Sequence, residues 1–166
     1  MSKSNTPPFE LDEFDVKLLD ALQENNQRTS EELADIVHLS PASCLRRAKR
    51  LREAKVISAD VSIVAPEVIG QRMTMIVLVS FEREQYDLID AFKASMRANP
   101  QVTQCYYVTG TIDFVMMISV KDVADYEAFT RKFFFENRNV KRFDTLVVMS
   151  CAKFDVNVKA SLALGS

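Results

Sequence analysis

The chain has 166 residues, of which 48% are hydrophobic and 27% are charged, a composition typical of a globular protein with one core or two small ones. Its net charge is −2 at neutral pH and its pI is near 5.5. These values exclude a generally basic nucleic-acid coat, so any DNA binding has to come from one local surface.

No secretory signal or membrane anchor is visible in the sequence. The first ten residues are mostly polar, and the longest apolar runs, such as residues 73–79, are far shorter than a membrane-spanning helix. Cys44, Cys105 and Cys151 lie within apolar patterns and lack the spacing of metal ligands. We therefore expect a cytoplasmic protein without a membrane partner, whose cysteines are buried thiols rather than disulfides.

Taken in chain order, residues 1–9 form a polar, proline-containing segment that predicts a flexible arm. Apolar residues three and four positions apart then predict an amphipathic helix over residues 12–24, which a pair of asparagines ends. Thr29 and Glu32 have the form of a capping box and predict a second, short helix.

A third helix follows after a turn, because Ser40 is a favoured N-cap and Pro41 suits the first helical position. With the second helix it forms a helix-turn-helix. The apolar residues expected on its inward face are Cys44, Leu45, Ala48 and Leu51. Its remaining side chains are strongly cationic, since six basic residues against one acidic residue leave a local charge of +5. These residues are Arg46, Arg47, Lys49, Arg50, Arg52 and Lys55, with Glu53 as the acid.

This charge has two interpretations. A run of like charges can be merely a solvated helix face, but mixed Glu and Lys residues would serve that purpose equally well. Here the cations are concentrated on one helix, next to small residues that would let the backbone approach a groove. We therefore favour contact with DNA. The predicted DNA-binding residues are Ser40, Ala42, Ser43, Arg46, Arg47, Lys49 and Arg50.

Two roles are expected among these residues, because the first two turns of a recognition helix enter the major groove. Base edges are expected to be contacted by Ala42, Ser43, Arg46 and Arg47. Lys49 and Arg50, a turn further on, are placed for phosphates.

Alternating apolar residues predict a two-stranded wing over residues 56–64, followed by a hinge at residues 66–70. The pattern beyond the hinge predicts four strands and two helices. The strands are expected at residues 73–81, 102–109, 113–120 and 142–154, and the helices at residues 85–98 and 123–137. The order βαββαβ is that of the ferredoxin-like plait, in which both helices cover one face of the sheet.

The strand at residues 73–81 is apolar on both sides, so both faces of the predicted sheet need cover. The helices cover one face, and we infer that a second copy of the chain covers the other. Phe133, Phe134 and Phe135 point in three directions on a helix, which favours further association. The alternative is that one or two of these rings pack under the hinge.

No catalytic arrangement stands out in the sequence. The chain has one histidine, His38, and only three glycines, which leaves neither a nucleophile with its base nor a glycine-rich phosphate loop. Because no Cys, Asp or Glu partner lies at ligand spacing from it, His38 is interpreted as a turn residue and no metal site is predicted. We expect a binding protein without a cofactor, not an enzyme.

Several segments of the chain resemble the Lrp/AsnC family, the leucine-responsive or feast/famine regulators. They are residues 11–23, 32–34, 39–41 and 44–47, together with Leu51 and Ile57. The family usually has glycine at two positions where this chain has His38 and Lys55. Both positions favour a left-handed backbone, which costs a residue other than glycine roughly 1 kcal/mol.

The resemblance implies an α+β fold, with an N-terminal winged helix-turn-helix and a C-terminal ferredoxin-like βαββαβ plait of the RAM type. It implies a homodimer that assembles to a tetramer, an octamer or a larger ring. It also implies an amino-acid effector, whose carboxylate lies near Gly110 and Thr111 and whose ammonium group pairs with Asp113. The implied effector-binding residues are Tyr107, Val108, Thr109, Gly110, Thr111, Asp113, Leu146, Val147 and Val148. The residues alone leave another reading open, in which Gly110 serves only the turn and Asp113 only caps it.

The expected domains are a flexible arm (1–9), a helix-turn-helix DNA-binding domain (10–57), a wing and hinge (58–72), and an effector-binding and oligomerisation domain (73–166). The expected function is sequence-specific transcriptional regulation on double-stranded DNA, in response to an amino acid or related small metabolite. Two alternatives stay open: an amino-acid-binding regulatory subunit acting on an enzyme, and an effector-independent nucleoid-type DNA organiser. A helix that contacts an enzyme would present apolar anchors outward, where this one presents Arg and Lys.

Overall fold

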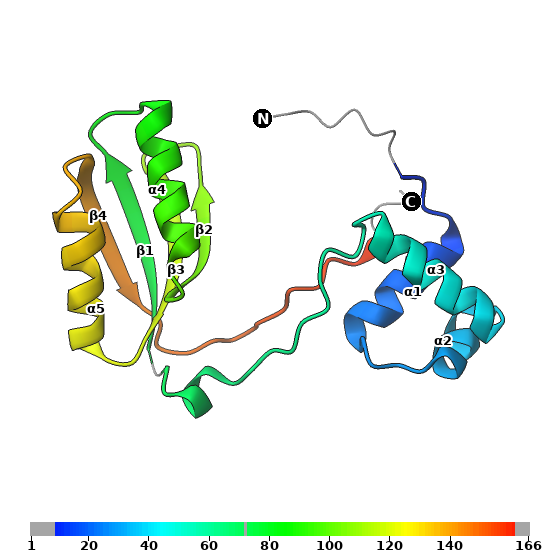
Figure 1. Cartoon of the computed structure of the whole chain (residues 1–166). Coiled ribbons are helices and arrows are strands. Elements are labelled where there is room, and N and C mark those ends of the chain that lie inside the picture. The colour runs from blue at the N-terminus through cyan, green and yellow to red at the C-terminus, as the bar shows by residue number, and fades with distance from the viewer. Residues whose placement is uncertain (1–8, 72, 162–166) are drawn as a thin grey trace. The chain divides into compact units, whose positions relative to one another are not determined.

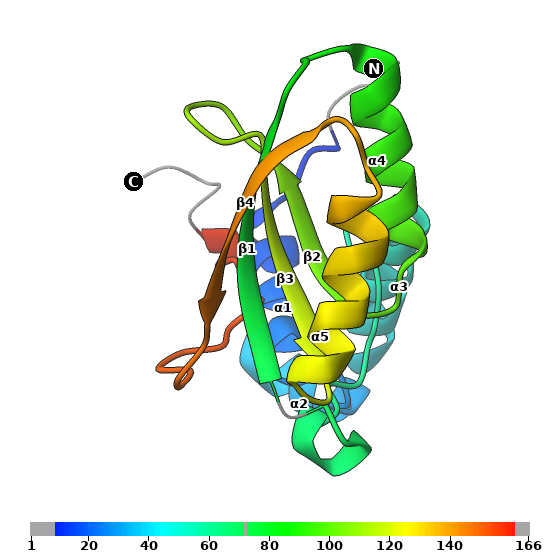
Figure 2. The ribbon, with the colours of Figure 1, turned by 90° about the vertical axis from the view of Figure 1, so that its left-hand side faces the viewer.

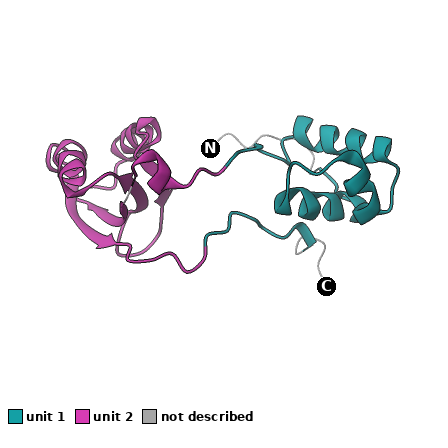
Figure 3. Cartoon of the chain, turned by 90° about the horizontal axis from the view of Figure 1, so that it is seen from below, with its two compact units in different colours: residues 1–62, 154–166 teal, residues 63–153 magenta. Residues whose placement is uncertain are grey.

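The computed structural model describes residues 9–71 and 73–161, and the chain divides into two compact units (Figure 1, Figure 3). The first unit contains residues 9–62 together with residues 154–161, and the second contains the described residues between them. The predicted arm lies outside the described residues except for Phe9. The last described segment belongs with the N-terminal helices, whereas the sequence placed it in the C-terminal domain.

Three helices make up most of the first unit: α1 (Glu13–Glu24), α2 (Ser30–Val37) and α3 (Pro41–Glu53). Each begins at a side-chain cap, because Asp12, Thr29 and Ser40 accept a hydrogen bond from the backbone N–H three residues on. The predicted helices and the predicted capping box at Thr29 are thereby confirmed. Asp12 forms a second capping box, in which Asp15 accepts from the Asp12 N–H at 3.3 Å.

The inward face of α3 differs from the prediction at one residue. Cys44, Ala48 and Leu51 are buried in the helix core as expected, but Leu45 is 58% exposed. Successive residues of an α-helix are rotated by about 100°, so a face centred on Cys44 and Ala48 turns Leu45 toward solvent. Leu45 is therefore a surface residue of α3.

His38 and Lys55 both have left-handed backbones, with φ of 61° and 58°. His38 ends α2, and its N–H donates to the Ala34 carbonyl at 2.8 Å. The expectation that these two positions require the conformation glycine takes freely is confirmed. His38 is a turn residue, as its isolation in the sequence indicated.

The predicted wing at residues 56–64 is wrong, since no strand occurs between α3 and the described start of the second unit. A strand needs a partner to pair its N–H and C=O groups, and the extended segment has none here. Its apolar residues Val61, Ile63 and Val64 are exposed. The predicted hinge contains a short 3-10 helix, η1 (Pro66–Ile69), which Gly70 ends with φ of 81°.

The second unit is a four-stranded antiparallel sheet with two helices on one face (Figure 2). Its strands are β1 (Met73–Phe81), β2 (Val102–Tyr107), β3 (Phe114–Val120) and β4 (Val140–Val147), and its helices are α4 (Tyr86–Ala98) and α5 (Val123–Thr130). The sheet order is β2-β3-β1-β4. This confirms the predicted βαββαβ plait.

The second predicted helix of the plait is shorter than expected, because α5 gives way to a π-helix, η2 (Arg131–Phe135). Here the three phenylalanines do point in different directions: Phe134 is buried, Phe133 is partly buried and Phe135 is 73% exposed. Phe134 and Phe135 both contact the ring of Phe143 on β4, at centroid distances of 4.7 and 5.4 Å. Whether Phe135 supports association stays a prediction.

Alternate residues of the central strand β1 separate the two faces of the sheet. Met75, Val77, Val79 and Phe81 are buried beneath the helices. The opposite face of β1 carries Ile76 and Leu78, which are only partly buried. Their sheet neighbours are Met117 and Leu146 for Ile76, and Val115 and Asp144 for Leu78. We call this face the bare sheet face.

The last predicted strand is also shorter, since β4 ends at Val147 rather than near residue 154. The Val148 N–H still donates to the Thr74 carbonyl at 2.9 Å, but β1 begins at Met73 and offers no further partner. The chain then returns to the first unit. Of the cysteines, Cys44 is buried and Cys105 half-buried, but Cys151 in this returning stretch is exposed, so the expectation of a buried thiol is wrong there.

The segment 154–161, which we call the C-terminal tail, is held against α1 by side chains of that helix. The Gln23 amide donates to the Val158 carbonyl and accepts from the Val158 N–H, both at 2.8 Å. Asp20 accepts from the Ala160 N–H at 2.7 Å, and Ala160 packs against the helix core. The tail thus completes the first unit without forming a strand.

Candidate nucleic-acid interface and effector loop

Helix α3 is fixed in the first unit by its cap and by its buried face. The Ser40 Oγ accepts from the Ser43 N–H at 3.3 Å, and Pro41 occupies the first turn. Cys44 and Leu51 are fully buried, and this buried face fixes the orientation of α3 about its own axis. The opposite side of the helix is left facing solvent.

The exposed side of α3 holds most of the predicted DNA-binding residues. Ala42, Arg46 and Lys49 are exposed, while Ser43 is half-buried and its Oγ accepts from the Ser40 Oγ at 3.0 Å. Lys49 lies 3.8 Å from the Glu53 carboxylate, but both side chains are largely exposed, so this pair is weak. Within the described part of the chain, Arg46 makes no ion pair.

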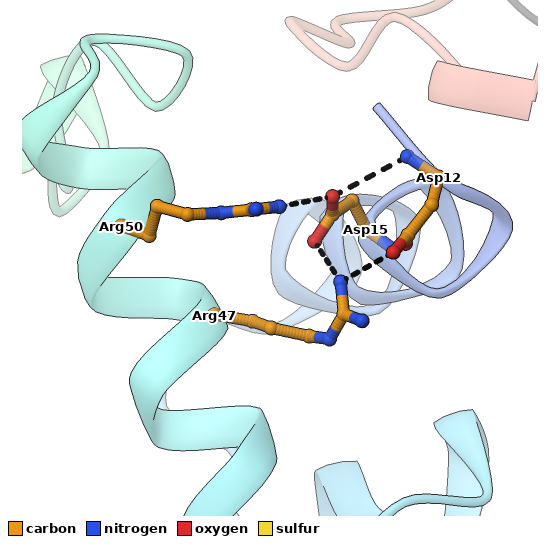
Figure 4. Close-up of polar contacts among 4 residues, drawn as sticks. All are labelled: Asp12, Asp15, Arg47 and Arg50. Carbon is orange, nitrogen blue, oxygen red and sulfur yellow. Dashed lines mark hydrogen bonds and ion pairs between the residues drawn. The ribbon is translucent and has the colours of Figure 1, made fainter. Parts of the chain in front are cut away.

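Arg47 and Arg50 instead reach back to α1 (Figure 4). The Arg47 Nη1 donates to Asp12 Oδ2 at 2.7 Å and to Asp15 Oδ1 at 2.8 Å. Arg50 Nη2 donates to the other oxygen of Asp15, whose side chain is fully buried. We call these four residues the α1–α3 ion-pair cluster. It joins α3 to the start of α1 by charge-assisted hydrogen bonds.

Two aromatic rings and the cluster's own charges shape its electrostatics. The guanidinium carbon of Arg47 lies 5.6 Å from the Phe14 ring, and that of Arg50 lies 5.0 Å from the Phe9 ring. The hydrogen bonds from Arg47 to Asp15 and Asp12 raise the pKa of its guanidinium. Although burial opposes its charged form, the Asp15 N–H and Arg47 lower the pKa of Asp12. Both shifts favour the charged forms of Asp12 and Arg47.

Arg52, another cation of this segment, is also paired. Arg52 donates to both carboxylate oxygens of Asp60, at 2.8 and 3.2 Å, and the same contact lowers the pKa of Asp60. The three acids, Asp12, Asp15 and Asp60, were not predicted from the sequence, because they lie 8 to 35 residues from their partners. The contact of Arg47 with base edges stays a prediction, and it would require this guanidinium to leave α1.

The depressed pKa of Asp12 makes a testable contribution to stability. A carboxyl group whose folded-state pKa lies below its ordinary value of 3.8 stabilises the fold above that pH, and the contribution is lost as the pH falls through the lower value. Asp12→Asn keeps an N-cap residue but loses the charge. We expect its free energy of unfolding to be lower than that of the unmutated protein at neutral pH, and this difference to become smaller below about pH 4. Urea unfolding across this pH range measures it. A constant difference at all pH values would contradict the prediction.

The predicted effector loop joins β2 to β3, and Figure 2 shows it extending away from α4 and α5. Gly110 has φ of 126°, a conformation that glycine alone takes readily. Asp113 accepts from the Phe81 N–H at 2.7 Å through its carboxylate, and its own N–H donates to Val79 at 2.9 Å. Asp113 therefore anchors the loop to the end of β1. Thr109 and Thr111 are exposed, and Val108 is half-buried.

The structure does not bring all the predicted effector residues together within one chain. Tyr107 lies on β2, where the ammonium group of Lys93 is 4.7 Å from its ring, whereas Leu146, Val147 and Val148 lie at the end of β4. β2 and β4 are opposite edges of the sheet. Leu146 also pairs with Ile76 near the start of β1, while Asp113 meets its far end. The loop and the β4 residues are thus separate within a protomer.

Comparison with known proteins assigns both units. The AsnC-type helix-turn-helix domain matches residues 11–52, which hold α1, α2 and all but the last residue of α3. The Lrp/AsnC ligand binding domain matches residues 74–158. The chain belongs to the Lrp/AsnC family of transcriptional regulators. In this Lrp/AsnC regulator, α3 lies in the first matched region and the loop at residues 108–113 in the second. The ligand-binding match also runs into the C-terminal tail.

Relatives of this Lrp/AsnC regulator include the uncharacterized HTH-type transcriptional regulator y4tD of Sinorhizobium fredii, 56% identical over 145 residues that cover 87% of this chain and 86% of that protein. The leucine-responsive regulatory protein of Haemophilus influenzae is 33% identical over 116 residues, 70% of each chain. A crystal structure of transcriptional regulator NMB0573 from Neisseria meningitidis, in complex with L-Met, is 30% identical and superposes with a TM-score of 0.83, covering 90% of this chain and 96% of that one. Among the described helices of this regulator, none is long and apolar enough to cross a membrane.

Proposed function

We propose that the chain is a sequence-specific DNA-binding transcriptional regulator whose plait forms dimers and binds an amino acid or a related metabolite. The observation that carries the DNA-binding part is the exposed side of α3, where Arg46 and Lys49 lie near small residues. The opposite face of the helix is buried and holds α3 in the first unit. In this proposal residues 10–57 are the DNA-binding domain, residues 58–72 the linker, and the plait from residue 73 the effector-binding and oligomerisation domain.

The cations of α3 have different roles in this proposal. Arg46 and Lys49 contact DNA, because both are exposed and neither is held by a buried carboxylate. Ala42 and Ser43 leave room for the groove walls beside them. Arg47 and Arg50 act first as positioning residues that set the angle of α3 on α1. Arg50 is half exposed and can also face a phosphate.

Replacing Arg46 and Lys49 together by alanine is expected to weaken binding to a high-affinity duplex about 10- to 100-fold at moderate salt. Each lost phosphate contact lowers the slope of log affinity against log salt by roughly one. Because Lys49 is placed for a phosphate and Arg46 for a base edge, the slope should fall by about one. Fluorescence anisotropy on a duplex selected from a random pool, and on its scrambled form, measures both quantities. The matched control replaces Lys132 and Lys141, two exposed cations of the plait, and should leave both unchanged.

Two outcomes would redirect the proposal. Equal affinity of the unmutated protein for selected and scrambled duplexes would favour a DNA organiser over a sequence-specific regulator. If no duplex binds at any salt concentration, α3 is not a DNA-binding helix in this chain.

The effector part of the proposal is supported by the ligand-binding match and by the relative that binds L-Met. Its structural basis is the loop at residues 108–113, whose exposed backbone near Gly110 and Thr111 can donate to a carboxylate. Because Leu146, Val147 and Val148 are far from this loop within a protomer, they join the site only from another copy. Assembly and effector binding are then linked.

An amino acid that binds is expected to raise the stability of the protein by about 2.7 kcal/mol when present at 100 times its Kd. Asp113→Asn should weaken this binding by about 1.5 to 3 kcal/mol, since the amide oxygen can still accept from the Phe81 N–H but no longer pairs with an ammonium group. Thermal unfolding with each of the twenty amino acids, followed by calorimetry, measures both effects. Asp87→Asn, on the exposed first turn of α4, is the matched control.

Unchanged effector affinity in Asp113→Asn would leave Asp113 with its structural role at the end of β1 alone. If none of the twenty amino acids stabilises the protein, the effector belongs to another class of metabolite.

A further inference from the structure

One exposed side of α3 includes an apolar side chain that neither the helix core nor the ion-pair cluster uses. Leu45 is 58% exposed and is not among the buried or partly buried residues of the core of the first unit. Residues three and four apart are neighbours on a helix surface, so Leu45 lies beside Ala42 and Lys49. Ala42 and Leu45 therefore make a two-residue apolar strip bordered by Arg46 and Lys49.

A single exposed leucine is common on protein surfaces, and exposure alone would indicate nothing. The position of Leu45 distinguishes it, because it lies next to Arg46 and Lys49, two exposed cations that no buried acid neutralises. These cations would bring the same side of α3 to the DNA backbone. Whatever they bind must then also cover Leu45.

The major groove of DNA offers one apolar group to such a side chain, the 5-methyl group of thymine. The other base edges in that groove present hydrogen-bond donors and acceptors, which leucine cannot satisfy. A protein partner would need acidic groups for Arg46 and Lys49 around an apolar recess. DNA supplies negative charge on both sides of the groove and a methyl group within it.

We propose that Leu45, with Ala42 beside it, contacts thymine methyl groups in the major groove and is a specificity-determining residue for A·T pairs there. This inference rests on the proposed DNA binding through α3. It changes the source of base selection, because the Arg47 guanidinium is bound to Asp15 of α1, while the exposed Leu45 side chain can enter the groove. Part of the sequence reading would then come from methyl contacts rather than from arginine alone.

The experiment replaces thymine by uracil, which removes only the 5-methyl group. The full chain first selects a high-affinity duplex from a random pool, and each thymine of that duplex is then changed singly to deoxyuridine. We expect one or two positions where affinity falls about three- to fivefold, the effect of losing one buried methyl group. In Leu45→Ala, affinity for the thymine duplex should fall by a similar factor or more, and the effect of deoxyuridine at those positions should disappear.

A matched control is Ile36→Ala, since Ile36 on α2 is also an exposed aliphatic residue, at 42%. It should keep the deoxyuridine effects of the unmutated protein. Circular dichroism melting of Leu45→Ala should be little changed, because the side chain is 58% exposed and does not belong to the buried core.

The inference is overturned if deoxyuridine has no effect at any position, or if its effect is the same in Leu45→Ala as in the unmutated protein. If the protein still prefers the selected duplex in either case, the proposed function stands, and Leu45 does not contact thymine methyl groups. If the unmutated protein prefers no duplex at all, the proposed function fails as well, so the two failures are distinguishable.

Discussion

Replacing Asp15 by asparagine is expected to lower the free energy of unfolding of the helix unit by about 2 to 3 kcal/mol. Asp15 is fully buried and accepts hydrogen bonds from Arg47, Arg50 and the Asp12 N–H. Removing one partner of a buried ion pair costs about 3 to 5 kcal/mol. We reduce this value because both guanidinium groups are partly exposed, so that water replaces some of the lost interaction.

Urea unfolding followed by circular dichroism measures this loss, and hydrogen exchange of the α1 to α3 amides assigns it to the first unit. Asp35→Asn removes an exposed carboxylate from α2 and controls for the change in net charge. Its effect should stay within about 0.5 kcal/mol. If Asp15→Asn were equally mild, the cluster would be a surface pairing without a structural role.

The same variant should also bind DNA differently. Arg47 and Arg50 would lose a shared carboxylate, which leaves the surface of α3 more positive and α3 less firmly oriented. We expect stronger salt dependence on a scrambled duplex and a smaller preference for the selected one.

The second large effect is expected for Leu78→Asp on the bare sheet face, which should weaken dimerisation more than 100-fold. Leu78 points away from the helices, next to Val115 and Asp144 on the neighbouring strands. In a dimer formed through this face, the new carboxylate would be buried without a partner and close to Asp144. The isolated protomer is little affected, because this position already faces outward.

Sedimentation at micromolar concentration measures the dimer, with Val123→Asp as the control. Val123 is 65% exposed on α5, on the side of the plait that the helices cover. A monomeric unmutated protein would refute the proposed dimer. A variant that stays dimeric would move the interface elsewhere, with the exposed Phe135 as the next surface to test.

The fold could be predicted largely because its signals are local. Side-chain caps such as Thr29 with Glu32 mark helix starts, and the alternation along Met73–Phe81 marks a two-sided strand. Left-handed backbones at His38 and Lys55 were expected from the resemblance, because the family usually has glycine at both positions. The predicted wing failed because alternation at residues 56–64 indicates an extended chain but cannot say whether a partner strand exists.

The candidate site was less predictable because it depends on contacts far apart in the sequence. From the sequence pattern, the inward face of α3 can be centred one residue earlier or later and still be apolar. The pattern therefore does not decide whether Leu45 is buried or exposed. The acids that hold Arg47 lie 32 and 35 residues earlier, at no fixed spacing. Likewise, Tyr107 and Leu146 were expected in one site, although they lie on strands at opposite edges of the sheet.

The C-terminal tail imposes an order on how the protein is made. Gln23 and its partner Val158 are separated by 135 residues, which a ribosome takes roughly 7 to 27 seconds to add at about 5 to 20 residues per second. The three helices can form during this interval, but the tail joins them only after the whole plait has been synthesised. Until the plait has been synthesised, Gln23 and Asp20 therefore lack their partners Val158 and Ala160, so the first unit is completed last.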